Sequence, residues 1–224
     1  MSTKASEASE IKSVPPATEA GILNFEPTEH KNIRTPHGFF DYDDIYRAIM
    51  DEAKDGDTIV EIGSWVGRST LYMAELVKYA SEKLNKRVRF VNVEPFLADV
   101  VIHADGSYGW VESTEGEKPK TRGEFYKNTE AFREFIETIE EKSVPAASKF
   151  KDGSIFAVWV DARHDYNSVM EDLRAWFPKV KKGGIIAGHD FTYDFGGVPK
   201  AVYDFCLENV LQYTVNHKSF VVYK

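Results

Sequence analysis

Ile59-Val60-Glu61-Ile62-Gly63-Ser64-Trp65-Val66-Gly67-Arg68-Ser69-Thr70 joins an apolar, largely β-branched strand to an amphipathic helix through a turn with two glycines. Glycine lets a backbone turn tightly against a ligand, and the first turn of a helix presents unpaired N–H groups. The spacing Glu-x-Gly-x-x-x-Gly differs from the Gly-x-Gly-x-x-Gly pattern, which places a pyrophosphate on the helix N-terminus. A carboxylate here attracts an ammonium group and repels a phosphate. The stretch therefore predicts a loop for a nucleoside cofactor that carries an amino group.

Strands and helices alternate along the chain on both sides of this loop. Apolar runs predict strands, helical spacing of apolar residues predicts helices between them, and the chain closes with two short β runs. This order predicts an α/β fold with a Rossmann-like, doubly wound sheet, mostly parallel, with an antiparallel C-terminal strand. The expected strands are 58–62, 88–95, 155–162, 185–191, 212–217 and 219–223, and the expected helices are 41–53, one from about 70 to 84, one from about 169 to 180, and 198–211.

One strand is missing from this pattern, between the second and third apolar runs. The degenerate segment 142–147 is the candidate for it, and Phe125, Phe132, Ile136 and Ile139 predict a helix before it.

Residues 1–33 lack an apolar period and predict a disordered or loosely attached tail. The remaining residues, 34–224, predict a single domain. A polar insertion at about 97–122, containing Tyr108 and Trp110, predicts a mobile lid over an acceptor substrate.

Composition limits the class of protein. The chain has 28 basic and 36 acidic residues, a net charge of −8, and therefore no overall attraction for nucleic acid. Its one cysteine, Cys206, excludes an internal disulfide framework, and no apolar run approaches the ~20 residues of a membrane span. We expect a soluble cytoplasmic protein whose partner is a small molecule, not nucleic acid or a membrane. The sequence leaves the oligomeric state open, a homo-oligomer included.

Two further runs carry polar residues at predicted strand ends. They are Val158-Trp159-Val160-Asp161-Ala162-Arg163-His164-Asp165-Tyr166 and Gly183-Gly184-Ile185-Ile186-Ala187-Gly188-His189-Asp190-Phe191. With the first stretch, they resemble the class I S-adenosylmethionine-dependent methyltransferases, and within these the group related to macrolide and aminocoumarin (macrocin-type) O-methyltransferases. The resemblance spans about residues 56–224 and is strongest at 58–70 and 156–191. It implies O-methylation of a small-molecule hydroxyl.

The resemblance implies S-adenosylmethionine as the cofactor. Glu94, at the end of the second predicted strand, would accept the ribose hydroxyls, and Ser69 would cap the helix and bond the methionine carboxylate. The full implied cofactor set is Glu61, Gly63, Ser64, Gly67, Ser69 and Glu94.

In that group of enzymes, the acids at the two later strand ends commonly hold a divalent metal. The resemblance therefore implies a metal site here, with Asp161 and Asp190 as ligands. Carboxylate oxygens suit Mg²⁺ or Mn²⁺. The pair His189-Asp190 departs from the two acids that the macrolide enzymes more often have at this position.

Candidate catalytic residues are His164, Asp161 and His189. His164 is the better candidate for a general base, because an imidazole titrates near neutral pH and His164 follows a strand end. Asp165 and Asp172 are expected to cap the next helix or to face solvent. Two alternatives stay open: a binder of S-adenosylmethionine or a nucleoside without transferase activity, and an NAD-dependent Rossmann enzyme, which the glycine spacing and the terminal hairpin disfavour.

Overall fold

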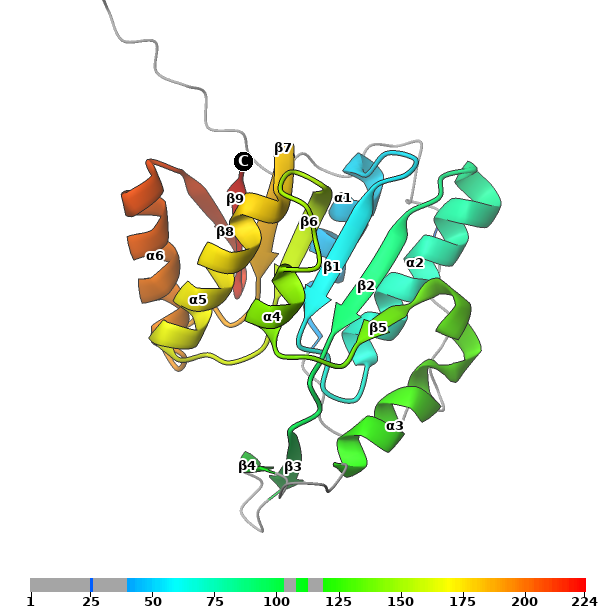
Figure 1. The fold of residues 1–224 in the computed structure, drawn as a ribbon, viewed down its shortest axis with the longest axis horizontal. Helices are drawn as coiled ribbons and strands as arrows, with labels where there is room; N and C mark the ends of the chain where they lie inside the picture. Colours follow the sequence, from blue (N-terminus) through cyan, green and yellow to red (C-terminus); the bar gives the residue numbers. More distant parts are fainter. Residues whose placement is uncertain (1–24, 26–39, 103–107, 113–118) are drawn as a thin grey trace, which may run out of the picture.

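A seven-stranded sheet forms the centre of the molecule in the computed structural model, which describes Phe25 and residues 40–102, 108–112 and 119–224 (Figure 1). The neighbouring strands β5, β2, β1, β6 and β7 are parallel, β9 is antiparallel to β7, and β8 is antiparallel to β9. This confirms the predicted fold class. In sheet order the strands are β5 (Glu137–Ile139), β2 (Arg89–Val93), β1 (Thr58–Ile62), β6 (Ile155–Val160), β7 (Val180–Gly188), β9 (Ser219–Tyr223) and β8 (Tyr213–Asn216).

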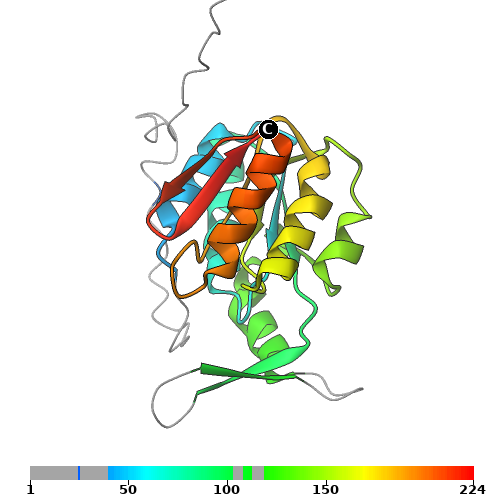
Figure 2. The same cartoon turned by 90° about the vertical axis from the view of Figure 1, so that its left-hand side faces the viewer.

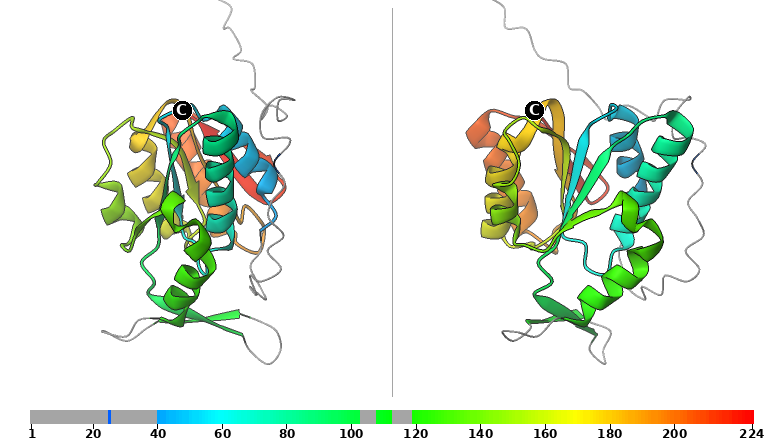
Figure 3. Two further views of the ribbon diagram at one scale, coloured as in Figure 1. Left: turned by 90° about the vertical axis from the view of Figure 1, so that its right-hand side faces the viewer. Right: turned by 45° about the vertical axis from the view of Figure 1, so that its right-hand side comes forward.

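Helices cover both faces of the sheet (Figures 1 and 3). On one face lie α1 (Asp43–Glu52) and α2 (Arg68–Leu84), and on the other lie α4 (Ser143–Ala147), α5 (Tyr166–Trp176) and α6 (Gly197–Asn209). Short 3₁₀ segments follow α3 (Lys120–Thr129) and α5; they are η2 (Glu130–Phe135) and η3 (Phe177–Lys179). Among the described residues, no helix is both long and apolar enough to cross a membrane.

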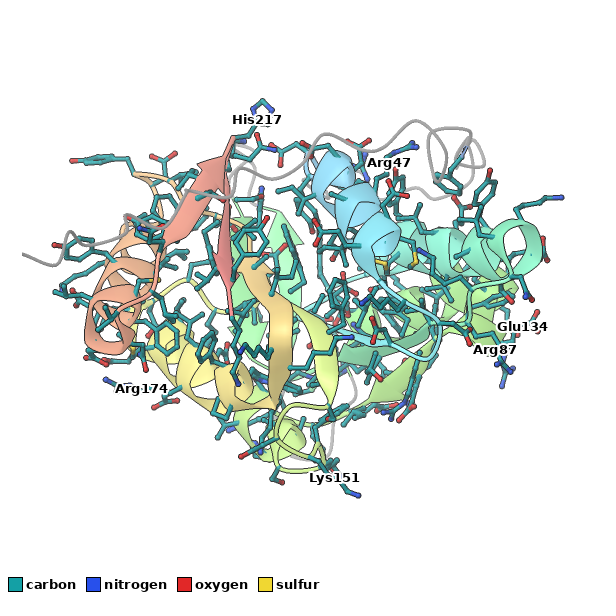
Figure 4. All side chains as sticks on the ribbon, turned by 90° about the horizontal axis from the view of Figure 1, so that it is seen from above. Arg47, Arg87, Glu134, Lys151, Arg174 and His217 are labelled. Carbon is teal, nitrogen blue, oxygen red and sulfur yellow. The ribbon has the colours of Figure 1, made fainter. Side chains whose placement is uncertain are left out.

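Alternate residues of the strands supply the two halves of the core. Ile59 of β1 packs in the half under α1 and α2, whereas its neighbour Val60 packs in the half under α4, α5 and α6. This is the arrangement expected of a sheet buried on both sides, and it explains why the central strands are nearly continuous apolar runs. Charged side chains such as Arg87 and Arg174 lie at the rim and point outward (Figure 4).

The chain changes direction across the sheet between β1 and β6. From β1 it continues outward to β2 and β5, and it then returns to the other side of β1 to form β6. Ligands of open α/β sheets bind beyond the carboxyl ends of the strands at such a switch point. Here the two strand ends are in close contact, since a Cβ added to Gly63 would lie 2.0 Å from the carbonyl oxygen of Asp161. Glycine at position 63, with φ of +85°, is therefore required by packing as well as by the turn.

A β-hairpin made of β3 (Ala98–Ile102) and β4 (Tyr108–Glu112) projects beyond the carboxyl ends of the parallel strands (Figures 1 and 2). It occupies much of the predicted lid. Thr121 fastens it to α3, because its N–H donates to Asp99 Oδ1 over 2.9 Å and its hydroxyl donates to the Ala98 carbonyl over 3.0 Å. Residues 103–107 and 113–118 of the predicted lid lie outside the described residues.

Three sequence predictions are wrong. The segment 142–147 is not a strand but contains α4, in which Pro145 has no N–H to donate to a sheet. The missing strand is instead β5, which includes Ile139, so the helix predicted through that residue ends earlier, at Thr129. Asp172 neither caps α5 nor faces solvent; its side chain is buried. Asp165, in contrast, caps α5 as predicted and accepts the Ser168 N–H over 3.0 Å.

The predicted tail, residues 1–33, lies outside the described residues apart from Phe25. Phe25 is buried against Tyr72 and Tyr79 of α2, with ring centroids 5.7 and 5.5 Å away. Its carbonyl accepts a hydrogen bond from Arg47 Nη1 over 3.0 Å. This residue is thus attached to the helical layer formed by α1 and α2.

Candidate functional site

Glu94 holds the turn between β1 and α2. Its Oε2 accepts the N–H groups of Ser64 at 3.0 Å and Trp65 at 3.3 Å, and its Oε1 accepts the N–H of Phe96 at 3.0 Å. Trp65 and Phe96 both have positive φ, +47° and +48°, which is costly for residues other than glycine. One carboxylate therefore stabilises two strained turns, after β1 and after β2, and brings them together. Burial raises the pKa of Glu94, and these three hydrogen bonds oppose that shift.

Glu61 lies beneath the same turn rather than facing outward. Only 1% of it is exposed, and its oxygens accept hydrogen bonds from the Tyr46 hydroxyl at 2.9 Å, from Asn92 Nδ2 at 3.2 Å and from the Thr70 hydroxyl. Burial raises the pKa of Glu61 to about 7, although bonds from Ser69, Thr70 and Tyr46 favour its charged form. The charge of Glu61 is thus close to the turn, while its hydrogen-bonding capacity is taken up by protein donors.

The N-terminus of α2 is capped by Gly67, not by the Ser69 side chain as the sequence suggested. Gly67 has φ of +88°, and a Cβ at this position would lie 2.9 Å from both Phe125 and Thr129 of α3. Ser69 follows in the first turn, where it is buried and its hydroxyl bonds Glu61. The helix start therefore presents backbone N–H groups beside the turn that Glu94 holds.

Asp161, His164 and Asp190 form a cluster at the carboxyl ends of β6 and β7. Their ligand atoms all lie within 4.8 Å of one another. His164 Nε2 is 2.9 Å from Asp190 Oδ2 and 3.7 Å from Asp161 Oδ1, but it makes no hydrogen bond of acceptable geometry with either. A buried ring nitrogen without a directed bond, between two carboxylates, is an N/O donor set that fits a divalent cation.

The cluster strongly perturbs its own protonation. Burial disfavours the charged form of His164, but the two flanking carboxylates outweigh this effect and raise its pKa to about 9. Burial likewise disfavours charged Asp190, yet His164 and His189 lower the pKa of this carboxyl well below its usual range. Asp190 also has φ of +57°, a left-handed conformation that Asp tolerates better than most residues. Perturbed pKa values and unusual backbone at one strand edge are typical of a functional site.

His189 is buried behind this cluster. Its Nε2 lies 2.8 Å from Asp41 Oδ1, and its Nδ1 lies 3.4 Å from Asp190 Oδ1. Both ring nitrogens thus face carboxylates, so His189 links Asp41 to the cluster instead of presenting a free nitrogen. Burial would lower the pKa of His189, but Asp190, Asp161 and Asp41 together raise it.

The structure brings the predicted residues together in two adjoining groups. Glu61, Gly63, Ser64, Gly67, Ser69 and Glu94 surround the turn after β1, and Asp161, His164 and Asp190 lie at the next strand end. Sequence reasoning missed several contributors, and of these only Asn92 had a signal, as a polar residue in an apolar strand. They include Asp41, Tyr42, Tyr46, Asn92 and Phe195, the last with its ring centroid 4.5 Å from that of His164.

A family model described as a methyltransferase domain matches residues 60–191 of the chain, which include both groups. None of the curated proteins matches significantly.

Several solved structures share the fold. A precorrin-6y methyltransferase from Geobacter metallireducens has a TM-score of 0.58 and 13% identity, covering 85% of this chain and 92% of that one. The calicheamicin methyltransferase CalS11 has a TM-score of 0.56 and 16% identity, covering 80% and 75%. A putative rRNA methylase from Clostridium thermocellum has a TM-score of 0.50 and 16% identity, covering 80% and 92%. At these identities the likeness shows the fold alone.

Proposed function

Because the chain belongs to this family of methyltransferase domains and is a transferase that uses S-adenosylmethionine, we propose that it methylates a hydroxyl group of a small molecule. The observation that carries the proposal is the contact between the two groups of the site. Gly63 of the turn after β1 packs directly on the backbone of Asp161, a member of the acid–histidine cluster. A cofactor at the turn and an acceptor at the cluster would therefore be neighbours, as methyl transfer requires.

The cofactor side of the proposal assigns a different task to each residue. Glu94 would accept a ribose hydroxyl with the one lone pair, on Oε1, that its three N–H bonds leave unused. The start of α2, with Ser69, would receive the methionine carboxylate. Gly63, Ser64 and Gly67 shape the turn. Glu61 would act from beneath the turn, through its charge and through the hydrogen bond that it accepts from the Thr70 hydroxyl.

On the acceptor side, Asp161, His164 and Asp190 are the residues that would hold Mg²⁺ or Mn²⁺. A cation bound there would orient the acceptor hydroxyl and lower its pKa. In the absence of a cation, His164 would be the candidate base; because its pKa is raised to about 9, it would take up the hydroxyl proton only in alkaline solution. His189, with both nitrogens facing carboxylates, is less suited to that task.

The reaction would be an in-line displacement at the sulfonium methyl group. An oxygen lone pair of the acceptor forms the new O–CH₃ bond while the S–CH₃ bond breaks and its electron pair stays on sulfur. The hydroxyl proton passes to the acid–histidine cluster, and S-adenosylhomocysteine leaves as a neutral thioether. Positioning and the removal of one proton are the main tasks of the protein.

The similar structures suggest two contrasting acceptors, because one is of a TDP-rhamnose 3′-O-methyltransferase and another is of a putative rRNA methylase. We favour a small-molecule hydroxyl because the stretches 58–70 and 156–191 resemble macrocin-type O-methyltransferases and because the chain carries a net charge of −8. The test is release of S-adenosylhomocysteine with a panel of phenols, glycosides and nucleotide sugars, and with ribosomal RNA as the counter-arm. Turnover on RNA alone, or methylation at carbon or nitrogen only, would refute O-methylation of a small molecule.

Metal dependence has its own test. Once an acceptor from this panel is found, exhaustive EDTA treatment is expected to lower the rate at least about tenfold, and Mg²⁺ or Mn²⁺ to restore it. Asp161→Asn and Asp190→Asn should lower the rate and lose this response. Full activity after EDTA treatment would remove the cation from the proposal and leave His164 as a metal-free base.

A further inference from the structure

The segment just before α1 lies near the start of the domain but contacts the acid–histidine cluster, which is formed by Asp161, His164 and Asp190. Tyr42, immediately before the first residue of α1, donates its hydroxyl proton to Asp161 Oδ2 over 3.0 Å. The preceding residue, Asp41, contacts His189, which in turn faces Asp190. These contacts join positions 119 and 148 residues apart. Two consecutive residues thus support the two carboxylates of the cluster, one directly and one through a histidine.

Tyr42 is held firmly where it makes this contact. It is 2% exposed, and its ring centroid lies 4.5 Å from that of Trp159 on β6 and 4.8 Å from that of His189. The ring therefore packs between the strand that precedes Asp161 and the histidine that precedes Asp190. A hydroxyl on such a fixed ring restricts the rotation of the carboxylate that it bonds.

The second support ends at the protein surface. Asp41 is partly exposed, with Oδ1 2.8 Å from His189 Nε2 and Oδ2 3.2 Å from Lys218 Nζ. The order Lys218, Asp41, His189, Asp190 is a chain of alternating basic and acidic groups that fixes the histidine ring from behind. Residues that hydrogen-bond to metal ligands orient those ligands without contacting the metal, and changing them typically weakens metal binding about 10- to 100-fold.

We propose that Asp41 and Tyr42 are positioning residues of the Asp161–His164–Asp190 cluster, setting its affinity for a divalent cation without touching cation, cofactor or acceptor. The inference rests on the metal role proposed above for that cluster. It assigns a function to the segment before α1, which lies outside the stretch matched by the family model.

The test is titration of the purified full-length protein with Mn²⁺ alone, following the electron paramagnetic resonance signal of free Mn²⁺. Tyr42→Phe and Asp41→Asn are each expected to weaken binding about tenfold. The matched controls are Tyr46→Phe, which removes a buried hydroxyl bonded to Glu61, and Asp44→Asn, which alters an acid bonded to Asn216; both should stay within about twofold of wild type.

A double-variant cycle separates positioning from general destabilisation. In a His189→Asn background the link from Asp41 to Asp190 is already broken, so adding Asp41→Asn should have little further effect on Mn²⁺ affinity. A general structural effect of Asp41 would persist in that background. Tyr42→Phe preserves the packed ring, so its Mn²⁺ titration still tests the inference if the His189 variants fold poorly.

The outcomes distinguish this inference from the proposed function. Wild-type binding of Mn²⁺ with unchanged affinity in Tyr42→Phe and Asp41→Asn would overturn the positioning role and leave the metal site intact. A wild-type protein that binds no Mn²⁺ would overturn both the metal role and this inference. S-adenosylmethionine affinity, measured on the same samples, should change by less than about threefold in Asp41→Asn, because Asp41 contacts His189 and Lys218 while Glu94 holds the cofactor turn.

Discussion

Glu61 lies directly beneath the turn between β1 and α2, where burial raises its pKa to about 7 and the surrounding protein donors favour its charged form. We expect Glu61→Gln to weaken S-adenosylmethionine binding about tenfold, or about 1.4 kcal/mol, because the amide no longer attracts the positive charges of the cofactor. The NH₂ group of the glutamine would also face one of the groups that now donate a hydrogen bond to Glu61. Calorimetric titration measures the effect, with the exposed Glu82→Gln on α2 as the control. Unchanged affinity in a folded Glu61→Gln protein would contradict this role.

Among individual residues, the sequence could identify those at the ends of apolar runs. Glu94, Asp161 and Asp190 stand out there because packing alone does not explain a polar residue at a strand end. Asp41 and Tyr42 could not be identified in this way, because their contacts with the cluster depend on how α1 lies on the sheet. No local spacing encodes a contact between residues more than a hundred positions apart.

Among the elements, α5 contains a buried acid whose titration affects folding. Burial raises the pKa of Asp172 to about 6, although a hydrogen bond with Ser143 of α4 favours its charged form. Folding therefore favours the protonated carboxyl, and the stability it contributes is complete below the unfolded pKa near 4 and is lost as the pH rises to about 6. Asp172→Asn should match wild type at pH ~4 and exceed it by on the order of 2 kcal/mol at pH ~8.

Urea unfolding at these two pH values measures the difference. The exposed Asp152→Asn, which alters a surface pair with Lys179, serves as the control and should leave the pH dependence of unfolding nearly unchanged. A variant at position 172 that is less stable than wild type at the higher pH would show that the charged carboxyl is the stabilising form.

The β3–β4 hairpin depends on Asp99 for its attachment to α3, where Asp99 accepts an N–H from the first helical turn. We expect Asp99→Ala to lower the free energy of unfolding by about 1 kcal/mol, the usual cost of a lost cap, and to speed hydrogen exchange over residues 98–102. Affinity for S-adenosylhomocysteine should stay the same, because Glu94 bonds other groups. Slower cofactor binding or lost affinity in this variant would mean that the hairpin belongs to the cofactor site.

Elements with a long apolar run or a clear helical period were predictable, whereas short edge elements were not. The strands β1, β2 and β6 are completely or largely buried, so their sequences are nearly continuous in apolar residues. In contrast, β5 has three residues, Glu137–Ile139, at the edge of the sheet, and none of them is fully buried. Such a strand is specified by its pairing with β2, which the local sequence does not reveal.

For the whole molecule, the sheet topology explains why two distant parts of the sequence form one site. The return of the chain from β5 to β6 places Asp161 against Gly63, and the next parallel strand, β7, adds Asp190. The alternation of strands and helices predicted this sheet and its antiparallel C-terminal strand. It could not predict that the segment before α1 would close over the same edge.

The most direct test of the central claim, that the turn held by Glu94 is the S-adenosylmethionine site, is calorimetric titration of S-adenosylhomocysteine into wild type and Glu94→Ala, with NAD⁺ as the comparison ligand. We expect one S-adenosylhomocysteine per chain, binding weakened at least about tenfold in Glu94→Ala, and no binding of NAD⁺. Equal affinity in a folded Glu94→Ala protein, tighter binding of NAD⁺, or no binding of S-adenosylhomocysteine by wild type would contradict the account.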